Sequence, residues 1–286
     1  MHDSTDLVRG RLGGFLIAAV AFGFAPNAAM AQMLTAASAI GTFTIAFDRE
    51  PFALMWGGTL SAPGVFHSHF FDTTASNYLS QSGAALLATG GSQEHPALSL
   101  RHEITPTGLN PAGQAASRYV QATSADFSVD ADTLAGTGHL GLTGVQKISV
   151  GTGIWAGSSL VYGDYALRYD PSARQSIWNA NGVTAIANGW FLENHIYSIV
   201  AGVYDFANLS LVVGDADNWQ MRGDLLISPE NAYMLTGVAK VEDVGDFCLG
   251  VGSYAGCAAA PVPVLGAFVL FGTGLAGLML KLKKNS

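Results

Sequence analysis

The sequence is poor in charged residues. Asp, Glu, Lys and Arg together make up 12% of its 286 residues, about half of the usual share of roughly 25%. Glycine is abundant, with 35 residues, and aromatic residues reach 10%. This composition favours strands and turns over helices with a solvated polar face. The length allows one large domain or two small ones and leaves the domain count open.

Basic residues are especially scarce in the middle of the chain. Without the five basic and two acidic residues of its two ends, the chain keeps 8 basic against 19 acidic residues, a net charge of -11. Such a body repels nucleic acid and anionic lipid unless it carries a concealed basic stripe. The remaining basic residues are scattered singly, which excludes a nucleic-acid partner: Arg49, Arg101, Arg118, Lys147, Arg168, Arg174, Arg222 and Lys240.

Familiar catalytic and cofactor motifs are also missing. The sequence has neither a phosphate-binding glycine loop with a lysine nor a dinucleotide fingerprint. The stretch Gly252-Ser253-Tyr254-Ala255-Gly256 resembles a nucleophile elbow, but its serine comes one position too early. We therefore expect no cofactor and no catalytic residue.

Long apolar runs occur only at the two ends. Arg9 and Arg11 precede the apolar run 13–25, which is too short to span a bilayer of about 30 Å comfortably. Ala29 and Ala31 then supply the small side chains that signal peptidase requires, so cleavage before Gln32 is expected. Residues 1–31 are thus predicted to be a signal peptide for the Sec translocon, since the two arginines are not adjacent. The alternative is an uncleaved anchor.

The second apolar run lies at the C-terminus. Residues 264–280 carry no charge, and a helix rising about 1.5 Å per residue over this stretch is near the lower limit for crossing a membrane. The cluster of Lys281, Lys283 and Lys284 that follows would stay in the cytoplasm and leave the body outside. We therefore predict one transmembrane helix within a tail of residues 261–286. The alternative is a buried hairpin strand.

The tail resembles a known class of sorting signals. Its Val262-Pro263-Val264 motif, its apolar stretch Leu-Phe-Gly-Thr-Gly-Leu-Ala-Gly-Leu at 270–278 and its basic end together resemble the PEP-CTERM class of exosortase-processed proteins of Gram-negative bacteria. The resemblance covers only the tail. It is closest to the variant subgroup without the glutamate, and lysine stands where arginine is commoner. It implies passage through the inner membrane to the cell surface, an exosortase as a partner, and exopolysaccharide in the surroundings.

The body, residues 32–260, is predicted to be a mainly β ectodomain. Residues 42–47 alternate so that Phe43, Ile45 and Phe47 share one face, as a half-buried strand requires. Alternation recurs at 159–169, 208–213 and 220–227. Many short strands with glycine punctuation predict an antiparallel β-sandwich or a jelly roll.

Turn chemistry separates these strands. Turns are expected at Asn181-Gly182, Asn188-Gly189 and Gly214-Asp215, and throughout the glycine-rich stretch 136–157. Residues 88–115, rich in glycine and proline, are predicted to form a long surface loop rather than a boundary between two sub-domains. One helix is expected near 76–88.

The only two cysteines are Cys248 and Cys257. Both follow the signal peptide, and an oxidising compartment permits a disulfide between them. Such a bond would close a short loop and fasten the end of the domain just before the tail. A free pair or a metal site is the alternative, although no histidine lies near them in sequence.

Metal binding has only weak candidates. His67 and His69 are two residues apart, so on a regular strand they point to the same side, with Asp72 nearby. A third ligand would have to be His95 or His102. Exposed or packed histidines are the plainer interpretation.

Calcium is the other metal to consider, because acidic loops could offer it oxygen ligands. Two groups qualify, and neither follows an EF-hand spacing: Asp126, Asp130 and Asp132, and Asp215, Asp217 and Asn218.

Two other residue types bear on function. A glycosidase needs a pair of carboxylates at a defined separation, which sequence does not give; the glutamates available are Glu94, Glu103, Glu193 and Glu230. Tryptophans stack on sugar rings or pack in a core; the candidates are Trp155, Trp178, Trp190 and Trp219. The sequence thus favours a non-enzymatic cell-surface or extracellular-matrix protein. A carbohydrate- or calcium-binding module is the alternative, and a secreted hydrolase is a third.

Overall fold

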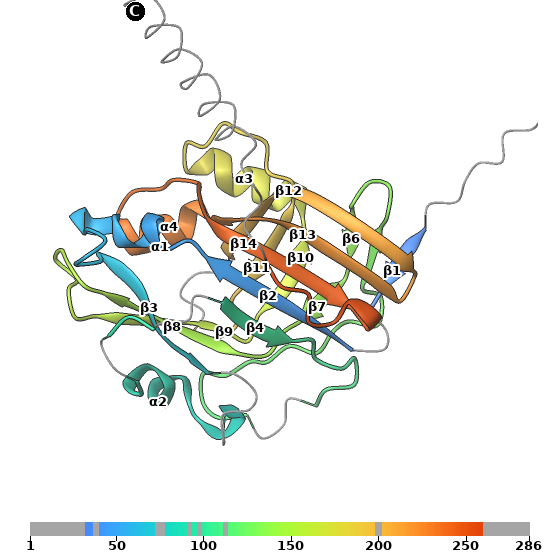
Figure 1. Ribbon diagram of the computed structural model, residues 1–286, viewed down its shortest axis with the longest axis horizontal. Coiled ribbons are helices and arrows are strands. Elements are labelled where there is room, and N and C mark those ends of the chain that lie inside the picture. Colours follow the sequence, from blue (N-terminus) through green and yellow to red (C-terminus); the bar gives the residue numbers. More distant parts are fainter. Residues whose placement is uncertain are drawn as a thin grey trace, which may run out of the picture. The chain divides into compact units, whose positions relative to one another are not determined.

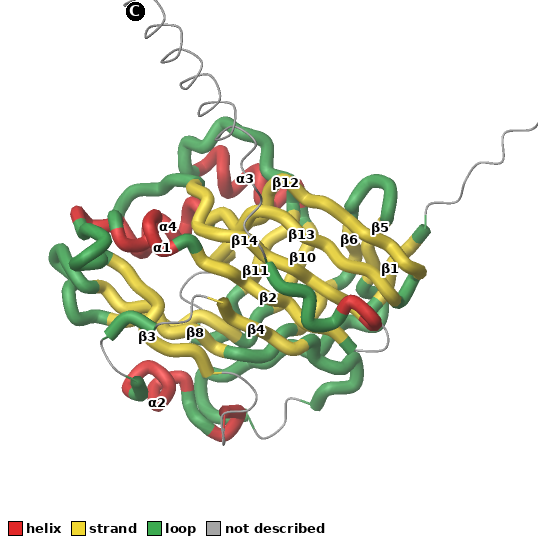
Figure 2. Tube along the Cα trace, in the orientation of Figure 1, coloured by secondary structure: helices red, strands yellow, loops and turns green. Residues whose placement is uncertain are grey.

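The computed structural model describes residues 32–36, 40–71, 78–90, 93–95, 99–110, 114–197 and 202–259. The chain divides into two units, residues 1–30 and 31–286, and every described element belongs to the second. This unit is mainly β (Figure 2). Every pair of neighbouring strands in its sheets is antiparallel. The predicted β-rich class is therefore confirmed.

An eight-stranded sheet dominates the described chain (Figure 1). Its longest strand, β12 (Gly202–Asp215), forms a hairpin with β13 (Asn218–Ile227), and β14 (Glu242–Val251) and β2 (Gly41–Phe47) continue the sheet on one side of it. The strands in spatial order are β4 (Ser99–Glu103), β2 (Gly41–Phe47), β14 (Glu242–Val251), β13 (Asn218–Ile227), β12 (Gly202–Asp215), β11 (Trp190–Glu193), β10 (Ala166–Tyr169) and β7 (His139–Gly141).

The two edge strands of this sheet meet at one end. A bridge joins Ile104 to Leu142, directly after β4 and β7. Thr105 N donates to Gly141 O at 2.9 Å, and Thr143 N donates to Glu103 O at 2.9 Å. Hydrogen bonds of each edge are therefore satisfied by the other edge at this end.

Alternation along the strands separates core from surface. In β13 every second residue is buried, including Trp219, Met221 and Leu225. In β2 the predicted inward face is confirmed, because Phe43 and Ile45 are fully buried and Phe47 is nearly so. Period-two alternation is what a sheet with one face on the core requires.

A smaller sheet packs across this core. It consists of β3 (Val65–Phe71), β8 (Val145–Val150) and β9 (Ser159–Gly163), and its Val65, Ile148 and Tyr162 join the core cluster of the eight-stranded sheet. Helix α2 (Gly83–Ala88) covers the other face, where its Leu86 packs with Phe71 and Val145. Because both faces of this sheet are covered, all six residues of β8 are buried.

The remaining elements are short. Strands β1 (Met33–Thr35), β5 (Ser128–Asp130) and β6 (Gly136–Thr137) form a third sheet. Helices α1 (Arg49–Ala53), α3 (Pro171–Ala180) and α4 (Pro229–Thr236) lie near one end of the eight-stranded sheet (Figure 1). The single-turn helices are η1 (Met55–Gly57), η2 (Tyr78–Ser80) and η3 (Gly252–Tyr254).

Four sequence expectations differ in detail from the structure. Residues 88–115 are not only a loop, because β4 lies within them and pairs with β2. The glycine-rich stretch 136–157 is not only turns, because it contains β6, β7 and the buried β8. The alternating run 159–169 is two strands in different sheets, β9 and β10, separated at Asp164 and Tyr165. The helix expected near 76–88 is shorter, and is α2.

Within the described residues, no helix combines the length and the apolar character needed to cross a membrane. The predicted signal peptide and the predicted transmembrane helix both lie outside the described part of the chain.

Candidate functional site

The two histidines of the weak metal candidate lie on β3, and a bulge lies between them. The register against β8 shifts between His67 and His69. His67 stacks on Phe47 in the main core, with ring centroids 3.9 Å apart, whereas His69 contacts Phe71 of the cluster under α2. A bulge adds one residue and breaks strict alternation, so the two rings belong to different packing clusters.

Two of the candidate histidines are buried in aromatic surroundings. Burial lowers the pKa of His67 to about 3 and that of His102 to about 4. His102 Nδ1 lies 2.6 Å from Thr143 O, whereas neither ring nitrogen of His67 has a hydrogen-bond partner in the described structure. Burial penalises the charged imidazolium, so both rings are neutral at pH 7.

The four candidate glutamates each bind a basic side chain. Glu94 accepts two hydrogen bonds from Arg49 at 2.6 Å, and Glu103 accepts one from Arg101 at 2.9 Å. Glu193 of β11 meets Arg168 of the neighbouring strand β10 and also His195, two residues further along the chain. Glu230 is held by Arg174. Each glutamate thus has a basic partner. Burial alone would raise the pKa of Glu193, but its bond to His195 and the charges of His195 and Arg168 lower it.

A buried ion cluster is built around Arg174 of α3. This guanidinium donates to Asp205 of β12 at 2.6 and 2.7 Å and to Glu230 of α4 at 2.6 and 3.1 Å. Trp178 Nε1 adds a bond to Asp205 at 2.8 Å. Burial disfavours the charged guanidinium, but the bonds to both carboxylates outweigh this and raise the pKa of Arg174. The cluster fastens two helices to the sheet.

The acidic turns use their carboxylates to hold the backbone. Asp130 Oδ1 accepts from the N–H groups of Asp132 and Thr133, both at 2.9 Å. Asp215 accepts from the N–H of Asp217 and from the amide of Asn218. These bonds lower the pKa of both Asp130 and Asp215. Across the residues with described positions, no three His, Cys, Asp or Glu side chains are grouped so that they could hold a metal ion.

The four candidate tryptophans divide into core and surface. Trp178, Trp190 and Trp219 are buried, as core packing requires, whereas Trp155 is 57% exposed. Its neighbour Ile154 is 82% exposed. Both lie in the loop between β8 and β9, in the stretch 151–158, which contains no charged residue.

An open groove of about 510 Å³ lies beside this loop. We call it the aromatic groove; it is lined by Trp56, Val150, Ile154, Trp155, Ser158, Ser159, Leu160, Tyr233, Met234, Leu235 and Gly237. None of these side chains is charged. The lining comes from η1, from the β8–β9 loop with the adjoining strand ends, and from α4 with the residue that follows it. Sequence reasoning missed all of it except Trp155.

The floor of the aromatic groove is held by hydrogen bonds between its three segments. Trp56 Nε1 donates to Leu235 O, and Thr152 Oγ1 donates to Trp56 O at 3.1 Å. Trp56 has a φ of 54°, a left-handed backbone conformation that a bulky residue rarely adopts. Tertiary packing therefore imposes the position of this indole, and such enforced strain is commonest at functional sites.

A second, more polar cleft lies elsewhere. It has a volume of about 400 Å³ and is lined in part by Thr133, Asn188 and Asn208, next to the rings of Tyr169 and Trp190. Hydroxyl and amide groups beside aromatic rings suit a neutral polar ligand. We call it the amide cleft.

Comparison of the chain with protein-family models, with curated protein sequences and with solved structures finds no match. The chemistry of these sites is therefore argued from the geometry alone.

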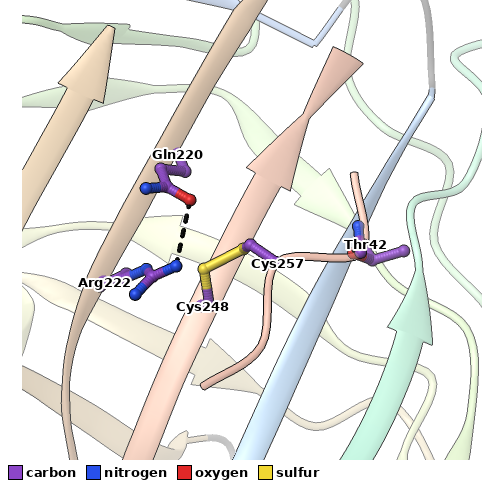
Figure 3. Close-up of a disulfide and its surroundings, with 6 residues drawn as sticks. Thr42, Gln220, Arg222, Cys248 and Cys257 are labelled. Carbon is purple, nitrogen blue, oxygen red and sulfur yellow. Dashed lines mark hydrogen bonds between the residues drawn. A yellow bond between two sulfur atoms is a disulfide. The ribbon is translucent and has the colours of Figure 1, made fainter. Parts of the chain in front are cut away.

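The predicted disulfide is confirmed. Cys248 of β14 is bonded to Cys257 (Figure 3). The intervening loop turns back so that Gly256 N donates to Thr42 Oγ1 of β2 at 2.7 Å. Gly252 to Tyr254 form η3 within this loop, which agrees with the expectation that this stretch is a disulfide loop and not a nucleophile elbow. The bond fastens the last described strand just before the tail.

The residues predicted to direct export lie almost entirely outside the described part. Among them only Gln32 is described, and it is exposed. The others are Ala29 and Ala31 at the cleavage site, Val262, Pro263 and Val264 of the sorting motif, and Lys281, Lys283 and Lys284.

Proposed function

We propose that this protein is exported and acts, without catalysis, at the cell surface or in the extracellular matrix. The observation that carries the proposal is the Cys248–Cys257 disulfide, which pairs the only two cysteines of the chain. Disulfides persist in oxidising compartments and are rare in the cytosol. This agrees with a signal peptide at residues 1–31 and with a sorting tail at 261–286.

The proposal assigns a task to each part. The Sec translocon exports the chain, signal peptidase cleaves after Ala31, and the tail holds the body at the inner membrane until an exosortase processes it. The body, a β-sandwich of packed antiparallel sheets, is then displayed among exopolysaccharide. The pairing of each candidate glutamate with a basic side chain supports a non-catalytic role.

The intact mass of the native protein from each cell fraction tests this proposal. We expect an exported chain that begins at Gln32, carries the mass deficit of one disulfide and either retains or has lost the tail. Ala31→Phe places a bulky side chain at the cleavage site and is expected to retain the leader. Met30→Phe is the matched control, since its position between the two small residues is unconstrained. Full-length wild-type protein in the cytosol, with free thiols, would contradict the proposal.

Carbohydrate binding is the second candidate, because the amide cleft combines amide groups with aromatic rings. The assay is saturable binding of the host's own polysaccharide, with and without calcium. Tyr169→Ala should abolish it, whereas Tyr119→Ala, at an exposed tyrosine that does not line the amide cleft, should not. Absence of saturable binding by the wild type rules out this candidate.

A further inference from the structure

Five of the thirteen exposed large apolar residues of the described chain lie on or directly beside the aromatic groove. Ile154 is 82%, Val238 62%, Tyr233 61%, Trp155 57% and Met234 40% exposed. The first four rank among the most exposed large apolar residues of the described chain. We call these five residues the apolar tip. They come from the β8–β9 loop and from α4 with the turn after it, two segments that both line the groove.

We propose that the apolar tip inserts into the headgroup–hydrocarbon boundary of a lipid bilayer. Its composition matches that boundary: Trp155 and Tyr233 are the residue types enriched at membrane interfaces, where one end of the ring is apolar and the other is wet. Ile154, Met234 and Val238 are aliphatic side chains that gain by entering hydrocarbon. A sugar ring would gain little from these aliphatic groups, because sugars stack on aromatic faces and hydrogen-bond to polar groups.

Charge orients the domain toward this contact. The body carries a net charge of -11, so anionic headgroups repel most of its surface. The apolar tip and the lining of the groove carry no charge. The nearest basic residue that follows the tip in sequence, Lys240, is already paired with Glu242. Binding therefore relies on apolar insertion and does not require anionic lipid.

The size of the apolar tip favours a bilayer over a second copy of the chain. A stable protein interface takes roughly 20–30 residues on each side, many more than the five residues here. Insertion into a bilayer needs only a few apolar side chains on a firm base, as in interfacial membrane binding. The base is firm here, since the bonds of Trp56 to Leu235 and to Thr152 tie the two segments together.

Tryptophan fluorescence tests the inference in the full chain. All five tryptophans lie in the body, at positions 56, 155, 178, 190 and 219, so an inserted tail contributes no signal. The protein is reconstituted into phosphatidylcholine vesicles with plain or brominated acyl chains. Trp178, Trp190 and Trp219 are buried in the protein, and Trp56 lies in the floor of the groove with its indole N–H bonded to Leu235 O. We therefore expect brominated lipid to quench roughly one fifth of the emission, the share of Trp155 among five indoles.

Three variants assign the signal. Trp155→Phe should remove the lipid-quenched component. Ile154→Ser keeps the indole but weakens insertion, so quenching should fall at least threefold. Ile186→Ser is the matched control, because Ile186 is 89% exposed and lines the amide cleft, not the aromatic groove; its quenching should equal that of the wild type. Near-ultraviolet circular dichroism checks that each variant is folded.

Four results would overturn the inference. One is equal tryptophan emission in plain and brominated vesicles, together with equal quenching of Trp155 by aqueous acrylamide in both. Another is shielding of Trp155 from acrylamide before lipid is added, in a monomer, which would mean that another part of the chain covers the apolar tip. The third is such shielding together with a doubled mass, which would indicate self-association. The last is a change in Trp155 emission on adding polysaccharide and none on adding lipid.

Discussion

Acid should destabilise this protein through two buried histidines, His67 and His102. Their pKa values in the fold are about 3 and about 4, both lowered by burial, whereas an unfolded histidine has a pKa of about 6.5. Below pH 6.5 these two histidines bind protons in the unfolded chain but stay neutral in the folded chain. The free energy of unfolding therefore decreases as the pH falls from about 6.5, and each contribution levels off once the pH passes the folded pKa.

The size of this decrease in the free energy of unfolding follows from how far the pH lies below the unfolded pKa. At pH 5.0 each ring lies about 1.5 pH units below its unfolded pKa, and at about 1.36 kcal/mol per unit each costs about 2 kcal/mol. Together they should lower the free energy of unfolding by about 4 kcal/mol between pH 7.5 and pH 5.0. This is a large part of the stability of a typical domain, about 5–15 kcal/mol.

His67→Phe isolates one of the two contributions. Phenylalanine fits the pocket formed by Phe47 and Phe52, and it removes two ring nitrogens that have no described hydrogen-bond partner. The variant should lose about half of the acid sensitivity, about 2 kcal/mol at pH 5.0. Urea unfolding at constant ionic strength, at pH 7.5, 6.5, 5.75 and 5.0, measures this.

His69→Gln is the control, because that ring is only partly buried and its loss should leave most of the pH dependence in place. Equal pH dependence in His67→Phe and the wild type would refute the reasoning. So would a wild type whose stability is constant between pH 7.5 and 5.0.

Two further predictions concern stability and use the same urea assay. Cys248→Ala with Cys257→Ala opens a loop with a sequence separation of 9 and should cost about 2–3 kcal/mol, equal to the effect of reducing the wild type; no loss would mean that the loop is already ordered without the bond. Arg174→Met leaves Asp205 buried without its charge partner and should lower the free energy of unfolding by about 3–5 kcal/mol. Arg168→Met is the control: it removes a half-exposed pair with Glu193 and should change the free energy of unfolding by less than about 1 kcal/mol. Similar losses in both would contradict the role assigned to the Arg174 cluster.

The strands that could be predicted were those with one face on the core. The runs 42–47, 208–213 and 220–227 alternate in sequence, and they lie within β2, β12 and β13. Strand β8 was missed because both faces of its sheet are covered, so polar and apolar residues are buried together. Its Gln146 and Lys147 are buried, which no period-two pattern indicates.

The helices α3 and α4 have a sequence signal at their first residues, not in a periodic pattern. Asp170-Pro171 and Ser228-Pro229 each place a capping side chain directly before a proline. In the structure Asp170 accepts from Ala173 N and Ser228 from Asn231 N, so both pairs begin helices.

The sites depended on tertiary contacts that sequence spacing does not show. His67 and His69 were expected on one side of a regular strand, and only the register against β8 reveals the bulge between them. Arg118 and Arg174 stand alone in sequence, yet each is buried against a carboxylate, Asp164 and Asp205. The aromatic groove joins segments about 80 to 180 residues apart in sequence. The disulfide, in contrast, could be predicted from the presence of only two cysteines and an oxidising compartment.

The meeting of β4 with β7 has a consequence for the protein at high concentration. Unpaired strand edges are templates on which other chains can add, and they are a common starting point for fibres. Here the bridge from Ile104 to Leu142 makes each outermost strand the neighbour of the other at one end. Many copies could therefore lie side by side without adding strands at this closed end of the sheet, and contacts formed there would have to be made by side chains.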